Sequence, residues 1–238
     1  MKKIFILFFL TIITTITISC GQVITNKFRL DKAFTLYEKG KNEDDDKALL
    51  DVTKTYNDII NQKIYAQDRQ AAVYRALGER SLAKSQYAYS AKYFTEALKI
   101  LPNSPYLRYG LGLSYANLSE SADTDEQKKN FIERAEKNIE FAISKDEKNP
   151  NYYAALASLR AFQQQRYDEA LELILKSVEI SPNNTDYLFI LAKIQYSMGN
   201  DQKAIETYRI IANSAKTEAI KRAALQNADR IIKGQYIK

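Results

Sequence analysis

Histidine and tryptophan are absent from the 238 residues, and cysteine occurs once, at Cys20. Zinc, haem and iron–sulfur sites built from histidine and cysteine sets are therefore excluded within a single chain. Nucleophilic centres that need a catalytic histidine are excluded for the same reason. No carboxylate pair falls where a pocket can be argued. We expect no catalytic residues, no metal and no cofactor, and a protein that is not an enzyme.

Glycine and proline are also scarce, with 7 and 4 residues. This composition disfavours a turn-rich β fold and favours a helical one. The formal net charge is +6, but no block of consecutive basic residues concentrates it. Because a clustered basic footprint is missing, we expect no nucleic-acid partner.

The N-terminal segment has the order of a secretory signal. Two lysines follow Met1, the stretch 4–18 is uncharged and mostly apolar, and Ser19 precedes Cys20. This resembles the bacterial lipoprotein signal peptide, although Thr17 departs from the usual aliphatic residue. The resemblance implies a signal over residues 1–19, a lipidated Cys20 bearing palmitate-type acyl chains, and a short tether over residues 20–27. The lipid bilayer would then be one partner.

The same resemblance implies a place in the bacterial cell envelope, facing the periplasm or the outer surface. Gly21 follows the cysteine, and a residue other than aspartate at this position implies the outer membrane where such sorting operates. Two alternatives stay open. No charge occurs from Ile4 to Asn26, so an uncleaved membrane anchor has enough length, and plain secretion after cleavage is the other.

Similar sequence segments recur in the rest of the chain, each with apolar residues at helical spacing. Three examples are 86–104, 166–183 and 201–214. Pro102 and Pro182 lie 80 residues apart, which equals two 34-residue periods and one 12-residue insertion. The resulting units are 71–104, 105–150, 151–184 and 185–218. This pattern resembles the tetratricopeptide repeat (TPR), a 34-residue helix–turn–helix unit.

The resemblance implies an all-α fold, an α-solenoid of about four to five helix–turn–helix units. Small residues would let helices approach closely, and larger ones would fill the space between repeats. Examples are Gly78 and Gly112 for the first kind and Phe94 and Tyr208 for the second. A degenerate helical pair over 28–70 precedes the good repeats, and a capping helix and tail over 219–238 close the array.

Two polar segments have a structural and a functional interpretation. The insertion at about 119–130 is either an exposed loop with an extra helical turn, opened by a capping box at Thr124 and Gln127, or a lip at one end of a groove. The acidic run 42–47 is a helix start favoured by the helix dipole, since it lacks the ligand spacing of a calcium loop.

The resemblance places a partner-binding groove on the first helices of the repeats. The candidate residues are Arg75, Glu79, Tyr106, Tyr109, Leu113, Tyr152, Leu159, Phe162, Phe189, Lys193 and Tyr196. Aromatic side chains with a polar tip are common binding anchors, but aromatics at helical spacing also serve as core. Glu79 stands where an asparagine of the chaperone-binding clamp is expected, and it would repel an acidic ligand.

These features predict a lipid-anchored scaffold or adaptor in the cell envelope that binds a protein or peptide segment in its concave groove. The alternative is a solute-binding accessory subunit of a transporter.

Overall fold

A computed structural model describes residues 27–39, 41–43 and 45–234. The regular structure in this part is helical without strands, which confirms the all-α prediction. Across the same residues no helix combines the length and apolar character needed to cross a bilayer. The signal, Cys20 and the tether up to residue 26 lie outside the described residues.

The chain divides into two compact units, Met1–Arg69 and Gln70–Lys238. In the first, residues 27–39 and 41–43 are helical, and the long helix α2 (Asp46–Ala83) begins. Ala33 and Val52 are buried between these helices. The acidic run starts α2 as predicted, because Asp45 Oδ1 accepts a hydrogen bond from the Ala48 amide at 3.1 Å.

The predicted boundary between residues 70 and 71 lies inside α2, which continues without interruption to Ala83. No proline or glycine occurs between Asp46 and Leu77, so nothing in the local sequence breaks the helix. The repeat pattern therefore locates the start of a packing unit at residue 71, although the helix makes no turn there.

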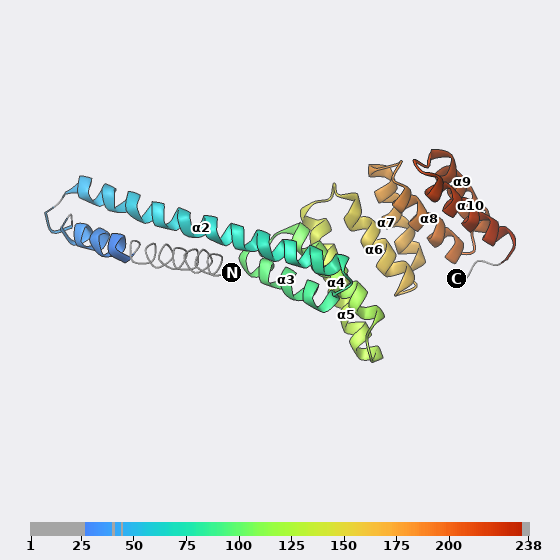
Figure 1. Cartoon of the computed structure of the whole chain (residues 1–238), viewed down its shortest axis with the longest axis horizontal. Coiled ribbons are helices and arrows are strands. Elements are labelled where there is room, and N and C mark those ends of the chain that lie inside the picture. Colours follow the sequence, from blue (N-terminus) through green and yellow to red (C-terminus); the bar gives the residue numbers. More distant parts are fainter. Residues whose placement is uncertain (1–26, 40, 44, 235–238) are drawn as a thin grey trace, which may run out of the picture. The chain divides into compact units, whose positions relative to one another are not determined.

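The second unit is a row of helices in which each helix packs on the next (Figure 1). The end of α2 is followed by α3 (Tyr87–Ile100), α4 (Pro105–Glu120), α5 (Asp125–Lys145), α6 (Pro150–Phe162), α7 (Tyr167–Ile180), α8 (Thr185–Ser197), α9 (Asp201–Ser214) and α10 (Glu218–Ile232). The final helix packs on α9. The predicted α-solenoid with a C-terminal capping helix is confirmed.

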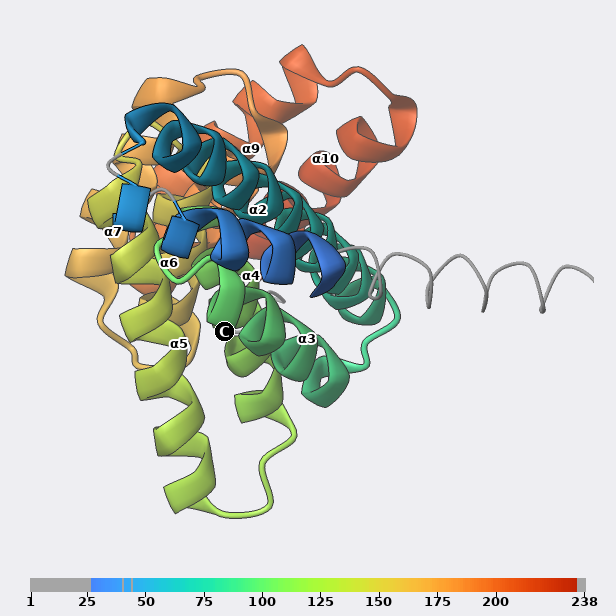
Figure 2. The same ribbon diagram turned by 90° about the vertical axis from the view of Figure 1, so that its left-hand side faces the viewer.

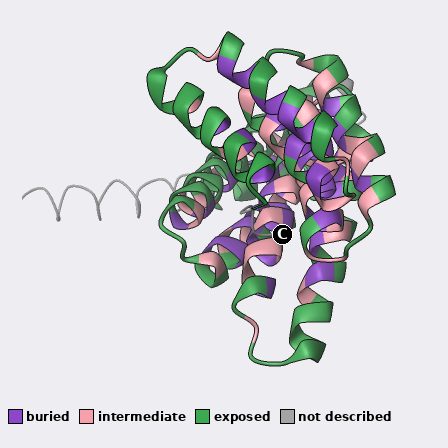
Figure 3. Cartoon of the chain, turned by 90° about the vertical axis from the view of Figure 1, so that its right-hand side faces the viewer, coloured by how far each residue is buried: buried purple, intermediate pink, exposed green. Residues whose placement is uncertain are grey.

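Residues at the predicted packing positions are buried on the facing sides of these helices (Figure 3). They include Phe94, Ala97, Ala135, Ala170, Ile174, Ala204 and Tyr208. A Cβ on Gly112 would lie 2.6 Å from Ile139 Cγ1, and a Cβ on Gly78 would lie 3.1 Å from the Phe94 ring. The small residues therefore permit the close helix contacts expected of them.

Three turns between paired helices share one backbone conformation. Ser85, Gln165 and Gly199 have φ values of 57°, 57° and 78°. The next amide in each turn donates to a carbonyl five or six residues back, at 2.8 to 2.9 Å. This is the left-handed helix ending in which glycine is favoured. The three positions are 80 and 34 residues apart, the same spacing as the sequence repeats.

The insertion lengthens two helices more than it adds a loop. Helix α4 has 16 residues, α6 and α8 have 13, and α5 has 21. Figure 2 shows the far ends of α4 and α5 projecting together from their neighbours. Thr124 Oγ1 accepts from the Gln127 amide at 3.2 Å, as the capping box predicts, while Gln127 Oε1 accepts from Asp123 instead of Thr124.

Candidate partner-binding groove

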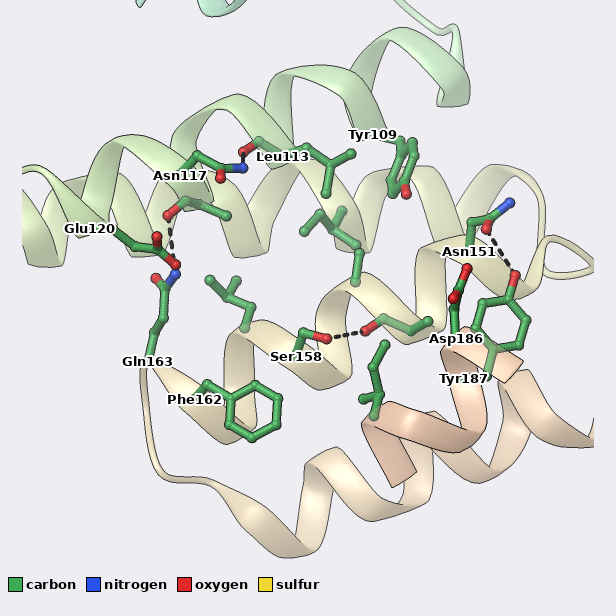
Figure 4. Close-up of a pocket in the computed structure, with 16 residues that line it drawn as sticks. Tyr109, Leu113, Asn117, Glu120, Asn151, Ser158, Phe162, Gln163, Asp186 and Tyr187 are labelled. Carbon is green, nitrogen blue, oxygen red and sulfur yellow. Dashed lines mark hydrogen bonds between the residues drawn. The ribbon is translucent and has the colours of Figure 1, made fainter. Parts of the chain in front are cut away.

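The first helices of three successive repeats, α4, α6 and α8, form the walls of a groove of about 360 Å³ (Figure 4). Its middle is apolar, because Leu113, Ala155, Leu159, Phe162 and Ile190 line it. Ile139 of α5 also contributes. Phe162 is 41% exposed and is thus available to a ligand, whereas Leu159 is buried.

One end of the groove is lined by polar groups from α6 and α8. Tyr187, in the first turn of α8, donates from its hydroxyl to Asn151 Oδ1 at 2.8 Å. Asp186 lies beside them and is exposed. The positive end of the α8 dipole favours a carboxylate at this position.

The opposite end is fixed by hydrogen bonds between α4 and the turn after α6. Gln163 Nε2 donates to the Ala116 carbonyl at 3.1 Å, and Gln163 Oε1 accepts from the Ser119 hydroxyl at 2.5 Å. Ser119 is buried. Glu120, the last residue of α4, lines this end of the groove.

Tyr109, which lines the groove, packs on the buried Tyr152 of α6, with ring centroids 4.9 Å apart. Burial raises the pKa of Tyr109 to about 12, and the neighbouring phenols of Tyr187, Tyr152 and Tyr106 act in the same direction. The Tyr109 phenol therefore stays neutral near neutral pH. Its hydroxyl has no hydrogen-bond partner among the described residues and is available to a ligand.

The predicted groove residues, apart from Lys193, divide into three groups. Tyr109, Leu113, Leu159 and Phe162 line the groove itself. Arg75, Glu79 and Tyr106 interact with one another to one side, since the Tyr106 hydroxyl donates to Glu79 Oε1 at 2.9 Å and Arg75 Nε lies 3.5 Å from the same carboxylate.

The third group packs within the helix array. Tyr152 is 2% exposed and Tyr196 is 9% exposed. Phe189 packs on the core with its ring 5.8 Å from that of Tyr208. These three occupy core positions, the alternative that the sequence left open. Lys193 is exposed, and its ammonium lies 4.6 Å from the centroid of the Phe162 ring.

Several lining residues were not among the predicted candidates. They include Asn117, Glu120, Asn151, Ser158, Gln163, Asp186, Tyr187 and Ile190. Asn117 and Gln163 each lie four residues after a predicted position, so the helical period alone would have found them. Ile190 lies three residues before the predicted Lys193 and shares its helix face. No comparable signal exists for Tyr187, because the contribution of α8 depends on its rotation relative to α6.

An ion-pair network holds α5, α6 and α7 together near the groove. Glu136 accepts from Arg160 Nε at 2.9 Å, from Arg166 at 2.9 Å and from Gln164 Nε2 at 2.8 Å. Burial raises the pKa of Glu136, but the hydrogen bonds from Gln164 and Arg160 and the charges of both arginines outweigh it, so the net pKa is lowered. Among the described residues, no cluster of three or more metal-ligating side chains is present.

Stacked helix pairs, a shared turn conformation and a groove lined by first helices define a helical-repeat protein. Profiles for the tetratricopeptide repeat match residues 124–185 and 161–227. Residues 124–227 are therefore similar to tetratricopeptide repeats, a class of unit that typically serves as a non-catalytic protein-interaction scaffold.

A "TPR repeat-containing protein" of Borreliella burgdorferi is 30% identical over 112 residues, which are 44% of this chain and 48% of the relative. The chain thus spans about half the length of this relative.

Two solved structures share the fold. A thermophilic TPR protein of Thermus thermophilus has a TM-score of 0.62 at 15% identity, covering 85% of this chain and 98% of its own. A mutant of the MamA protein has a TM-score of 0.50 at 19% identity, covering 71% of this chain and 90% of its own. At these identities the likeness concerns the fold alone.

Proposed function

We propose that this protein is an adaptor that holds a peptide or protein segment in the groove between α4, α6 and α8. The observation that carries the proposal is the combination of an apolar floor, an exposed Phe162 and an unpaired Tyr109 hydroxyl in one concave surface among the described residues. Rigid aromatic anchors surrounded by polar groups are typical of binding hot spots.

The test is partner capture by Tyr109→Ala and Phe162→Ala combined in one protein. The double variant loses partner capture while the circular-dichroism spectrum stays that of the wild type. Leu175→Ala is the matched control, because Leu175 is 47% exposed on α7 and does not line the groove. Full capture by a folded double variant would contradict the proposal.

We further propose that the protein is a lipoprotein, anchored to a membrane of the bacterial envelope through acylated Cys20. The proposal is supported by the basic start, the apolar stretch 4–18 and the Ser19–Cys20 pair. Because a single acyl chain gives only marginal binding, stable anchoring needs more than one chain. Mass spectrometry of the mature N-terminus tests this point: an unmodified Cys20 behind an intact Met1 would refute lipidation.

A solute-binding role beside a transporter is the second candidate. The observation that favours it is the groove volume of about 360 Å³, which is within the range of small-molecule sites. A ligand specific for the folded state raises the melting temperature. A metabolite that does so in the wild type, and fails to do so in Phe162→Ala, would favour this role over the adaptor.

A further inference from the structure

The charges that line the groove are all of one sign. Glu120 and Asp186 are its only ionisable carboxylate residues, and no lysine or arginine is among the lining side chains. The chain as a whole has the opposite charge balance, with 35 basic and 29 acidic residues. Neither carboxylate forms an ion pair with another described residue.

The two carboxylates lie at opposite ends of the groove (Figure 4). Glu120 shares one end with Gln163, and Asp186 shares the other with Asn151 and Tyr187. Between them the lining is mainly apolar. One cation lies nearby, since the Lys193 ammonium lies over the Phe162 ring. Phe162 precedes Gln163, so this ammonium borders the apolar part of the groove on the Glu120 side, and it is the carboxylates at the two ends that favour cations of a ligand.

Glu120 reaches the groove because of the insertion. It is the final residue of α4, which is three residues longer than α6 and α8. The hydrogen bond from Ser119 to Gln163 and the one from Gln163 to Ala116 fix this end of α4 against the turn after α6. The insertion therefore supplies a lip that carries a negative charge.

We propose that the groove selects segments with a basic side chain at each end and apolar side chains between them. Glu120 pairs with one basic group, Asp186 pairs with the other, and Phe162 and Leu113 contact the apolar part. The inference rests on the proposed adaptor function and names its partner class. Complementary charge at an interface contributes mainly to specificity and association rate.

The spacing of the two basic residues follows from helix geometry. Tyr109 lies at the Asp186 end and Glu120 at the other, and the stretch of α4 between these positions rises about 16 Å at ~1.5 Å per residue. An extended peptide covers ~3.3 Å per residue. Two lysines about five positions apart therefore span the groove.

The test uses three fluorescein-labelled hexapeptides with the same apolar centre, Leu-Ser-Phe-Ser, and with lysine, glutamate or serine at both ends. Binding to the full chain in detergent micelles is measured by fluorescence anisotropy at about 50 mM NaCl, where surface charges are weakly screened. We expect the lysine peptide to bind at least about fivefold more tightly than the glutamate peptide, from two exposed ion pairs. We also expect about 500 mM NaCl to reduce this preference.

The variant that tests the assignment combines Glu120→Gln with Asp186→Asn. It erases the preference for lysine and keeps the affinity for the serine peptide. The matched control combines Glu126→Gln with Asp201→Asn, because both residues are exposed, lie in the first turn of a helix and do not line the groove. The control keeps the preference.

Equal affinity for the lysine and glutamate peptides, or a preference that survives in the Glu120 and Asp186 variant, would overturn the inference. In that case serine-peptide binding that is lost in Phe162→Ala leaves the adaptor function standing. Binding of none of the three peptides also overturns the charge inference, and the adaptor function is then decided separately by crosslinking from position 162 in cells.

Discussion

The rings of Tyr109 and Tyr152 lie 4.9 Å apart at an interplanar angle of 44°, and they join the first helices of two successive repeats. Aromatic pairs in such tilted arrangements add to the stability that burial provides. Tyr152 is 2% exposed and belongs to the helix array, while Tyr109 also lines the groove. This contact makes the groove wall part of the packed structure. The groove therefore has its shape before a ligand binds.

Replacing the Tyr109 hydroxyl and replacing its ring have different expected effects. Tyr109→Phe changes the free energy of unfolding by less than about 0.5 kcal/mol, because the hydroxyl has no partner among the described residues. Tyr109→Ala lowers it by about 2–3 kcal/mol, because the ring contact and its buried area are lost. Urea unfolding measures both. A cost above about 1 kcal/mol for Tyr109→Phe would show that the hydroxyl is bonded.

The three left-handed turns offer a matched pair of substitutions. Gln165→Gly raises the free energy of unfolding by about 0.5–1 kcal/mol, because a side chain at φ 57° strains the backbone. Gly199→Ala lowers it by about 1 kcal/mol from backbone strain alone, since its Cβ would contact nothing within 4 Å. Thermal melts of the two variants are predicted to shift in opposite directions, and shifts of the same sign would contradict the shared turn conformation.

Gly110 packs so closely against Phe94 that no side chain fits at this position. A Cβ there would lie 2.4 Å from Cζ of Phe94, whose side chain is 1% exposed. Gly110→Ala therefore destabilises the protein by about 1–2 kcal/mol, in spite of the better helix propensity of alanine. A double-mutant cycle with Phe94→Leu checks the cause. The alanine is expected to be neutral or stabilising once the ring is gone, and an equal cost in both backgrounds would locate the clash elsewhere.

Glu136 gives the stability a defined pH dependence. Its pKa is lowered in the folded protein, so the stability it contributes is fully present above its unfolded pKa of about 4.3 and is lost as pH falls through the lower folded value. Glu136→Gln costs about 1–3 kcal/mol at neutral pH through the lost charged hydrogen bonds.

Urea unfolding of both proteins between about pH 7 and pH 3 measures this effect. The difference in free energy between wild type and Glu136→Gln is predicted to shrink below about pH 4. A difference that stays constant across this whole range would show that Glu136 is not held in its ionised form by Arg160 and Arg166.

The repeated fold was predictable because its determinants are short-range and periodic. Phe94, Ala97, Ala170 and Tyr208 are buried at the spacing that the recurring segments predict, since a helix returns to the same face about every 3.6 residues. The capping helix was likewise predictable: α10 begins at Glu218, one residue before the predicted 219, and the Thr217 hydroxyl at its N-cap accepts from the Ile220 amide at 3.3 Å.

The groove was predictable only in part, because it depends on how successive repeats rotate relative to one another. Tyr109, Leu113, Leu159 and Phe162 line it as expected, whereas Phe189 and Tyr196 pack within the core. The Gly110 contact and the position of Glu120 depend on neighbouring helices and on the longer α4. A single repeat sequence carries no information on either.

Site-specific photocrosslinking in living cells tests the central claim most directly. A benzophenone amino acid replaces Phe162 in the groove, and the same probe replaces Leu175 on α7 as the control. We predict a discrete crosslinked protein from position 162, identified by mass spectrometry, that is absent from position 175 and is lost when Tyr109→Ala is added. The same adduct from both positions, or none from position 162 in a folded and normally abundant protein, would contradict binding in the groove.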